Sequence, residues 1–253
     1  MHLLSSVLMQ LMAAYIVLIE PFLRTNFYRR LKKQLNLDAG ARILYYRTQV
    51  LWEWSWVVVL VLIVLPIPGP FQWLGLMPPT SFGWIILAVL VLGIGLSIYV
   101  LRRNPAAMAN MQRSLESSSI LLPTTPAERN WFITSTITAG ICEELLYRGF
   151  LLRYLSIYFP GLGWLFSAII SGVIYGLSHA YLGRKNVLQT MLNGFSFAIV
   201  YFLSGNLLSS IASSQPVALF GSVIPAMVFH ALAELRPMFL WQPEERKKKN
   251  KRK

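Results

Sequence analysis

The sequence predicts an all-α fold, a polytopic membrane helical bundle with about seven transmembrane helices. Of its 253 residues, 55% are hydrophobic and only 13% are charged, which is about half the charged fraction of a soluble globular protein. The mean hydropathy is +0.54. Apolar runs of about 20 residues, the length that crosses a hydrocarbon core of about 30 Å, recur along the chain. Lipid, rather than a folded soluble core, is therefore the expected solvent for most of its side chains.

Seven apolar runs are the expected spans. The second contains the sequence WVVVLVLIVLPIPG, and the first has no basic segment before it and no small-residue cleavage site after it, so we expect a retained helix rather than a signal peptide. The fourth is long and carries four charged residues, so its inner half must face protein or water. The runs lie at residues 3–22, 51–68, 82–101, 131–158, 163–179, 187–204 and 216–235.

Basic residues predict the orientation of these spans. Lys and Arg gather between the first two spans, in 102–130, at Arg184 and Lys185, and from Arg236 onward. The three intervening connections contain neither residue type. Because basic loops stay in the cytoplasm, we expect the N-terminus outside and the C-terminus in the cytoplasm.

The net charge of +13 indicates a membrane surface rather than nucleic acid. The C-terminal ERKKKNKRK follows the last span directly, and a basic cluster in that place attracts anionic lipid headgroups by about 1 kcal/mol per charge. Anionic lipids at the basic loops and tail are therefore expected partners, and nucleic acid is not.

The least apolar interior segment, 102–130, is expected to be a cytoplasmic linker. It should contain a short amphipathic helix near 105–117, and Thr124 or Thr125 could cap the helix that follows. The chain then divides into N-terminal transmembrane helices with basic cytoplasmic loops, a catalytic helical core and a basic cytoplasmic tail, at residues 1–130, 131–240 and 241–253.

Ionisable residues inside membrane spans are costly and mark function by default. A small set of them lies in the fourth, fifth and seventh spans. The candidate site residues are Glu143, Glu144, Arg148, His179, His230 and Glu234.

The spacing along the helices predicts that these groups meet. Glu143 lies 17 residues before Pro160 and His179 lies 19 residues after it, which correspond to about 25 and 28 Å of helix. If the last span begins near 216, His230 lies about 21 Å into it. All three would then lie in the cytoplasmic half of the membrane.

The two adjacent glutamates must have different roles, because neighbouring residues point about 100° apart on a helix. Glu144 stands four residues before Arg148, the favourable order for an ion pair. Glu143 is left free to face a cavity, which suits a general base that activates water. In this interpretation Glu144 and Arg148 support the site, His179 orients or shares the proton, and His230 donates to a developing oxyanion.

Other polar groups are not expected to act. Glu20 and Glu53 lie at span ends, where water and headgroups reach. Cys142 has an apolar neighbourhood that leaves a thiol inert, and a single cysteine cannot form an intrachain disulfide. Ser178, in a Gly-Leu-Ser-His sequence, could suggest a serine protease, but that mechanism would leave both glutamates unexplained.

Three short motifs carry the candidate residues, and they resemble motifs of the CPBP family. They are Glu-Glu-x-x-x-Arg, aromatic-x-x-x-His and His-x-x-x-polar, here Glu143, Glu144 and Arg148, then Tyr175 and His179, then His230 and Glu234. This family contains the CAAX-protease and bacteriocin-processing membrane proteins, also called Abi proteins, and includes the type II CAAX prenyl endopeptidases. EELLYRGFLL and GSVIPAMVFHAL are similar to its first and last motifs, and the resemblance covers about 130–240.

The resemblance implies an intramembrane endopeptidase in a bacterial plasma membrane. A glutamate-activated water would cleave a protein or peptide substrate that enters from the membrane or cytoplasmic side. No covalent acyl-enzyme and no cofactor would be needed. As a less favoured variant, a His₂Glu zinc site could form from Glu143, His179 and His230, although no His-Glu-x-x-His is present.

Two positions depart from the family pattern, which commonly has Phe at Tyr175 and Asn at Glu234. An Asn side chain can donate to an oxyanion, whereas Glu can do so only when protonated. Either burial holds Glu234 neutral, or His230 alone holds the oxyanion.

Two other functions remain as alternatives. The resemblance also admits a non-catalytic membrane adaptor or a bacteriocin self-immunity protein. A small transporter is less favoured, because the chain lacks two evident inverted halves.

Overall fold

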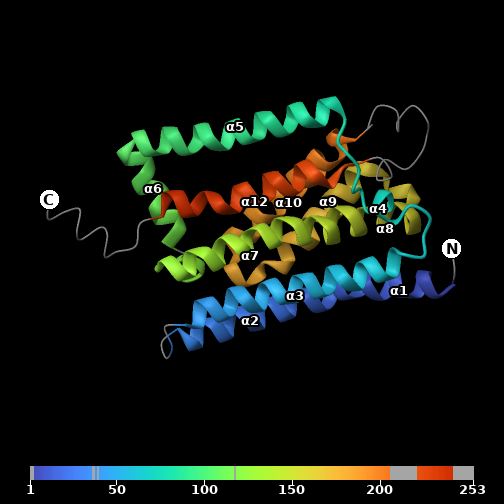
Figure 1. The fold of residues 1–253 in the computed structure, drawn as a ribbon, viewed down its shortest axis with the longest axis horizontal. Coiled ribbons are helices and arrows are strands. Elements are labelled where there is room, and N and C mark those ends of the chain that lie inside the picture. Colours follow the sequence, from blue (N-terminus) through green and yellow to red (C-terminus); the bar gives the residue numbers. More distant parts are fainter. Residues whose placement is uncertain (1–2, 36–37, 39, 117, 206–220, 242–253) are drawn as a thin grey trace, which may run out of the picture.

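All regular elements in the described residues are helices, in a computed structural model that describes residues 3–35, 38, 40–116, 118–205 and 221–241. The long helices run side by side along one axis (Figure 1), which confirms the all-α helical bundle. The elements are α1 (Leu3–Ala14), the π-helix η1 (Tyr15–Ile19), α2 (Glu20–Gln34), α3 (Ala41–Val64), α4 (Pro70–Trp73), α5 (Ser81–Arg103), α6 (Pro105–Glu116), η2 (Ser119–Leu121), α7 (Pro126–Glu144), the π-helix η3 (Leu145–Leu151), α8 (Leu152–Tyr158), η4 (Pro160–Leu162), α9 (Gly163–Ser178), η5 (Ala180–Leu182), α10 (Arg184–Ser204) and α12 (Val223–Leu240).

Six helices of the described chain are long and apolar enough to cross a membrane. They are Leu4–Gln34, Ala41–Val64, Ser81–Arg103, Pro160–Ser178, Asn186–Ser204 and Val223–Leu240. The remaining expected span, 131–158, is also continuous helix, through α7, η3 and α8. It is more polar than the other six and lies in the centre of the bundle. With it, the described residues form a bundle of about seven long helices.

Three expected span boundaries are wrong. The first helix continues to Gln34 instead of ending near 22, and the second long helix begins at Ala41 instead of near 51. Arg24, the first charged residue beyond 22, is buried against other helices and does not interrupt the first helix. The last helix begins at Val223 rather than near 216, and residues 216–220 lie outside the described part of the chain. The depth derived for His230 from a start at 216 is therefore also wrong.

Helix α7 forms the centre of the fold, between α3 and α12 (Figure 1). Its second half is small or polar and buried, including Ser135, Thr138 and Gly140. A Cβ atom on Gly140 would lie 2.8 Å from the Cβ and 2.9 Å from the backbone nitrogen of Ala231 on α12. The absence of a side chain at this position is what lets α7 and α12 approach so closely.

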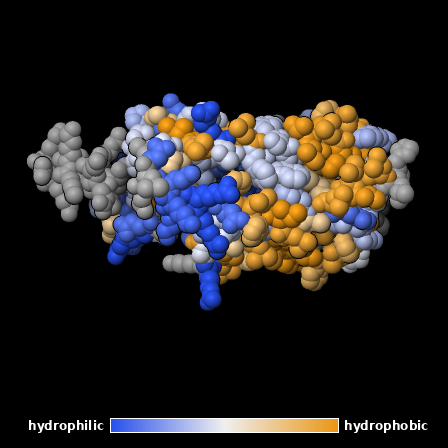
Figure 2. All heavy atoms as spheres, turned by 90° about the horizontal axis from the view of Figure 1, so that it is seen from below, coloured by the Kyte–Doolittle hydropathy of each residue, from blue (hydrophilic) through white to orange (hydrophobic). Residues whose placement is uncertain are grey.

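The outer surface is apolar over most of the bundle. Helix α5 has the highest hydropathy of the candidate spans and no buried residue in its most apolar window, and Leu92 on it is 71% exposed. Figure 2 shows hydrophilic residues gathered at one end of the molecule and hydrophobic residues covering most of the rest. A surface of this kind is stable in lipid rather than in water.

The linker between α5 and α7 forms at the hydrophilic end. The expected amphipathic helix is α6, and Thr125 caps α7 in a capping box with Glu128, so both features are confirmed. Arg42 Nε donates to the Ile120 carbonyl oxygen at 2.9 Å, and Tyr46 Oη donates to that of Leu121 at 2.7 Å. The linker is thereby attached to the first turns of α3.

Candidate active site

Two adjacent carboxyl groups lie at the end of α7, where the helix changes into the π-helix η3. Glu143 is 1% exposed, and Glu144 and Arg148 are completely buried. Arg148 Nη1 donates to Glu144 Oε1 at 2.7 Å, and Arg148 Nη2 donates to the Gly194 carbonyl oxygen of α10 at 2.7 Å. The expected Glu144–Arg148 ion pair is therefore present, and π segments inside helices are frequent at functional sites.

His230 reaches the same place from α12. Its Nδ1 lies 2.8 Å from Glu144 Oε1, and because an ionised carboxylate only accepts, Nδ1 is the donor. Its Nε2 lies 3.1 Å from Tyr175 Oη, 3.4 Å from Glu234 Oε1 and 3.8 Å from Glu143 Oε2. Phe197 of α10 stacks on the ring, with centroids 4.5 Å apart. The imidazole is thus fixed in orientation, with Nε2 directed toward Glu143.

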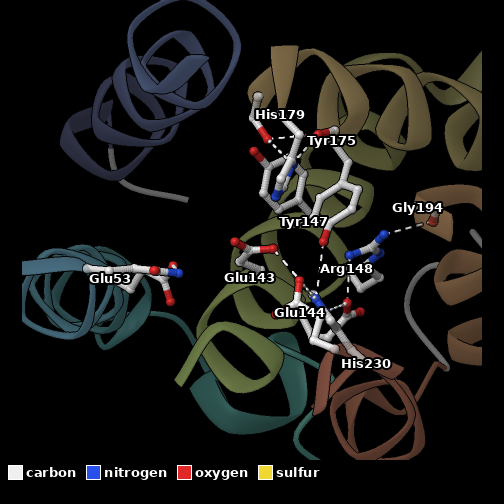
Figure 3. Close-up of polar contacts among 12 residues, drawn as sticks. Glu53, Glu143, Glu144, Tyr147, Arg148, Tyr175, His179, Gly194 and His230 are labelled. Atoms are coloured by element: carbon white, nitrogen blue, oxygen red, sulfur yellow. Dashed lines mark hydrogen bonds and ion pairs between the residues drawn. The ribbon is translucent and has the colours of Figure 1, made fainter. Parts of the chain in front are cut away.

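His179 reaches the cluster from the end of α9. Its Nδ1 lies 2.9 Å from the Tyr175 carbonyl oxygen and 3.0 Å from Ser178 Oγ. A carbonyl only accepts, so the proton of a neutral imidazole resides on Nδ1 and leaves Nε2 as an acceptor. In Figure 3, His179 and Tyr175 lie on one side of Glu143, while Glu144 and His230 lie on the other.

The two glutamates differ in how their oxygens are used. Glu144 Oε1 is bonded by Arg148 and His230. Neither oxygen of Glu143 makes a hydrogen bond of ordinary geometry with any described residue. A fully buried carboxylate with both oxygens free of hydrogen bonds is unusual, and this one faces two imidazoles.

The sequence analysis missed a third part of the site, which comes from α2. Arg24 Nη2 lies 2.7 Å from Glu143 Oε1 and 3.5 Å from Glu53 Oε1, and Arg24 Nε donates to Glu20 Oε1 at 2.9 Å. Tyr147 Oη in turn donates to Glu20 Oε2 at 3.0 Å.

The expectation that Glu20 and Glu53 meet water and headgroups is wrong, as is the placement of Arg24 in a basic loop. Both glutamates are 2% exposed and Arg24 is 9% exposed. A signal was available in the sequence: Glu20 and Arg24 have the same i, i+4 spacing as Glu144 and Arg148. An ion pair at that spacing is compatible with a helix that continues beyond residue 22.

Glu234 lies next to His230 on α12, at the edge of the cluster. Its side chain is 39% exposed, and its Oε1 lies 3.4 Å from His230 Nε2. The alternative in which burial keeps Glu234 neutral requires a buried carboxyl group, and this side chain is not buried.

The candidate zinc ligands are not arranged as a metal site. Among the described residues, no three His, Cys, Asp or Glu side chains form a group that could hold a metal ion. Arg24 brings a positive charge to 2.7 Å from Glu143, in the place that a metal bound to Oε1 would need. Glu143, His179 and His230 therefore do not fit zinc in this arrangement.

A groove adjoins the site between α2, α3 and η5. Its lining includes Phe27, Tyr45 and Trp52 together with Arg24 and Glu53. Tyr45 lies one turn after Arg42 and near the hydrophilic end, so the groove links that end of the molecule to the partners of Glu143.

Residues 126–213 match the family model for type II CAAX prenyl endopeptidase Rce1-like proteins. The match covers less than half of the chain and contains Glu143, Glu144, Arg148, Tyr175 and His179. Comparison with curated proteins and with solved structures gives no match. The matched region brings the buried glutamates and His179 together in a bundle of apolar helices, so this part of an integral membrane protein is similar to CAAX-type proteases.

Proposed function

We propose that the protein is an intramembrane endopeptidase that hydrolyses peptide bonds with a water molecule activated by Glu143. The observation that supports this most strongly is the state of the Glu143 carboxylate. It is buried and hydrogen-bonded to no described group, and its Oε2 faces His230 Nε2 at 3.8 Å. Arg24 lies 2.7 Å from Oε1, so the carboxylate has a counter-charge while its hydrogen-bonding capacity stays available to a water molecule or substrate group.

The reaction begins with Glu143 as general base. It takes one proton from water while the water oxygen attacks the scissile carbonyl carbon, and His179 Nε2 accepts a hydrogen bond from the same water. The tetrahedral intermediate then collapses, the C–N bond breaks, and Glu143 gives its proton to the leaving amine. The products are a carboxylic acid and an amine, which ionise to carboxylate and ammonium in water, and no acyl-enzyme forms.

The oxyanion is stabilised by the groups around His230. The Nε2 of this ring and the hydroxyl of Tyr175, 3.1 Å apart, are the donors closest to Glu143 on the α12 side. Glu234 at 3.4 Å supports the protonated form of the imidazole. Removal of one oxyanion donor typically lowers kcat by about 10²–10³.

Glu144 and Arg148 hold this arrangement rigid. Through one carboxylate and one guanidinium they link α7 to α12 at His230 and to α10 at Gly194. Fixed donors lose less energy to reorganisation during the reaction than mobile ones.

The site opens toward the cytoplasmic side in this proposal. The adjoining groove extends toward the hydrophilic end, where the basic residues of the linker and of the first turns of α3 lie. Substrates are therefore proteins or peptides that enter from that side or laterally from the membrane, and anionic lipids bind the basic end. The C-terminal basic cluster lies outside the described residues.

The test is Glu143→Gln, which keeps the volume of the side chain and removes its basicity. The purified variant is incubated in detergent with a peptide library, and new termini are identified by mass spectrometry. Activity should fall by at least about 10³-fold, as expected when a general base is lost together with its positioning of water. In ¹⁸O-labelled water the wild type should place one label in each new carboxylate.

The matched control is Glu116→Gln, an exposed carboxyl on α6, which should cleave like the wild type. Equal thermal midpoints of the two variants would show that Glu143→Gln is folded. A folded Glu143→Gln protein with wild-type turnover would refute the mechanism. If Glu143→Ala also preserved the cellular phenotype, the non-catalytic adaptor would be the better account.

A further inference from the structure

We propose that Arg24 is a positioning residue for Glu143, so that α2, which lies outside the matched region 126–213, completes the active site. The inference rests on the proposed role of Glu143 as general base. It adds a residue from a helix that no motif in the sequence points to.

The first step is the contact itself. Arg24 Nη2 lies 2.7 Å from Glu143 Oε1, while the other oxygen, Oε2, faces His230 Nε2 at 3.8 Å. The cation thus restrains one oxygen and leaves the second directed at the imidazoles. The contact is an ion pair without hydrogen-bond alignment, so Oε1 also keeps a lone pair for water.

The second step is that Arg24 is itself fixed. Glu20, one turn earlier on α2, accepts from Arg24 Nε at 2.9 Å and from Tyr147 Oη at 3.0 Å. Tyr147 lies in η3, only four residues after Glu143. A closed path of contacts therefore runs from α7 through η3 to α2 and back to Glu143.

The third step is electrostatic. A buried carboxylate is stable in its ionised form only beside a compensating charge. Arg148 is engaged with Glu144 and Gly194, so it does not serve Glu143. Arg24 supplies the guanidinium that lets Glu143 begin the reaction as an unprotonated base.

The groove beside Arg24 makes a chemical test feasible. Arg24 and Glu53 form part of its lining, so the guanidinium is reached from the surface along this groove. If Arg24 is shortened, a small guanidinium compound can reach the vacated position from this groove.

The experiment compares Arg24→Gln, Arg24→Lys and Arg24→Ala in detergent, with the peptide substrate that the wild type cleaves. Arg24→Gln should lose about 10²-fold in kcat, the size of effect that a misplaced reacting group produces, with KM changed less than about threefold. Arg24→Lys should recover most of the loss, and methylguanidinium should raise the kcat of Arg24→Ala at least about tenfold. Arg30→Gln, at an exposed position on the same helix, is the control and should match the wild type.

Wild-type kcat in folded Arg24→Gln, or equal losses in the Gln and Lys variants without rescue, would overturn the proposal. If Arg24→Gln does not fold, the Glu20→Gln variant tests the proposal instead. This variant keeps the Arg24–Glu143 ion pair and removes only the carboxylate that holds Arg24 in place. It should lower kcat about three- to tenfold, and an unchanged kcat would overturn the proposal. Glu143→Gln is assayed in parallel: if it remains active, the proposed function itself fails, whatever the Arg24 variants do.

Discussion

The close contact between α7 and α12 predicts that Gly140→Ala lowers activity although it alters no polar group. The new Cβ would lie 2.8 Å from the Cβ, 2.9 Å from the nitrogen and 3.0 Å from the Cα of Ala231. Carbon atoms prefer about 3.5–4.0 Å, so the helices must separate by about 0.7 Å. Ala231 follows His230 directly, and the shift therefore reaches the imidazole.

The separation lengthens the contacts that link the two helices. The bond from His230 Nδ1 to Glu144 is 2.8 Å long and the distance from Nε2 to Glu143 is 3.8 Å, so a shift of this size weakens both. We expect a loss of about 10²-fold in kcat and of about 1–3 kcal/mol in the free energy of unfolding.

Gly93→Ala is the matched control, because nothing lies within 4 Å of a Cβ added to Gly93 on α5. It should leave turnover unchanged and stabilise the helix by up to about 1 kcal/mol. The assay combines peptide cleavage with thermal unfolding in the same detergent. Wild-type kcat in Gly140→Ala would show that the α7–α12 distance does not set the geometry of the site.

Three further predictions concern single groups. Tyr175→Phe should lower kcat about 10²-fold with little change in KM, because it removes one donor near His230 Nε2 while keeping the ring; an unchanged kcat would exclude the hydroxyl from oxyanion binding. Chelators should leave cleavage unaffected, and about one equivalent of zinc in the purified protein together with inhibition by chelators would contradict this. Burial opposes ionisation of Glu128, but bonds from Thr124 and Thr125 and the charge of Arg42 outweigh it and lower the pKa of this carboxyl. The ionised Glu128 carboxylate therefore stabilises the fold at pH values above the pKa that this group has in the unfolded chain. This contribution is lost as the pH falls through the lower pKa that the group has in the folded protein. Glu128→Gln should cost about 1 kcal/mol at neutral pH, and the difference in thermal midpoint from the wild type should shrink in acid; a difference independent of pH would refute it.

The sequence predicted the features that depend on neighbouring residues. Apolar run length located the helices, and the Glu144–Arg148 pair followed from a spacing of four residues on one helix. The cap of α7 was expected at Thr124 or Thr125 and lies at Thr125, because capping is likewise a local pattern. Such features need no knowledge of the tertiary fold.

The contact between Arg24 and Glu143 could not be predicted in this way, because 119 residues separate the two along the chain. The local sequence pattern also placed the end of the first helix near residue 22, where the charged residues begin. A charged residue terminates an apolar run only if it faces lipid, and Arg24 faces three carboxylates instead. Which face of α2 meets α7 is decided by packing across the bundle.

The two adjacent glutamates illustrate how packing assigns chemistry. Each is paired with its own guanidinium at 2.7 Å, Glu144 with Arg148 from the same helix and Glu143 with Arg24 from α2. Glu144 Oε1 also accepts a hydrogen bond from His230 Nδ1. Glu143, by contrast, has a counter-charge but no hydrogen bond to a described residue. The local pair thus holds helices together, and in the proposed mechanism the distant pair is the reactive one.

This division predicts that the chain without α2 is inactive. A chain that begins after α2 would keep Glu143, both imidazoles and the Glu144–Arg148 pair, but it would leave the base without Arg24. Supplying residues 1–40 as a separate co-expressed segment should then restore cleavage, and the same segment with Arg24→Gln should not. If the shortened chain folded and cleaved peptides at the wild-type rate by itself, the charge that Glu143 needs would have to come from residues after α2.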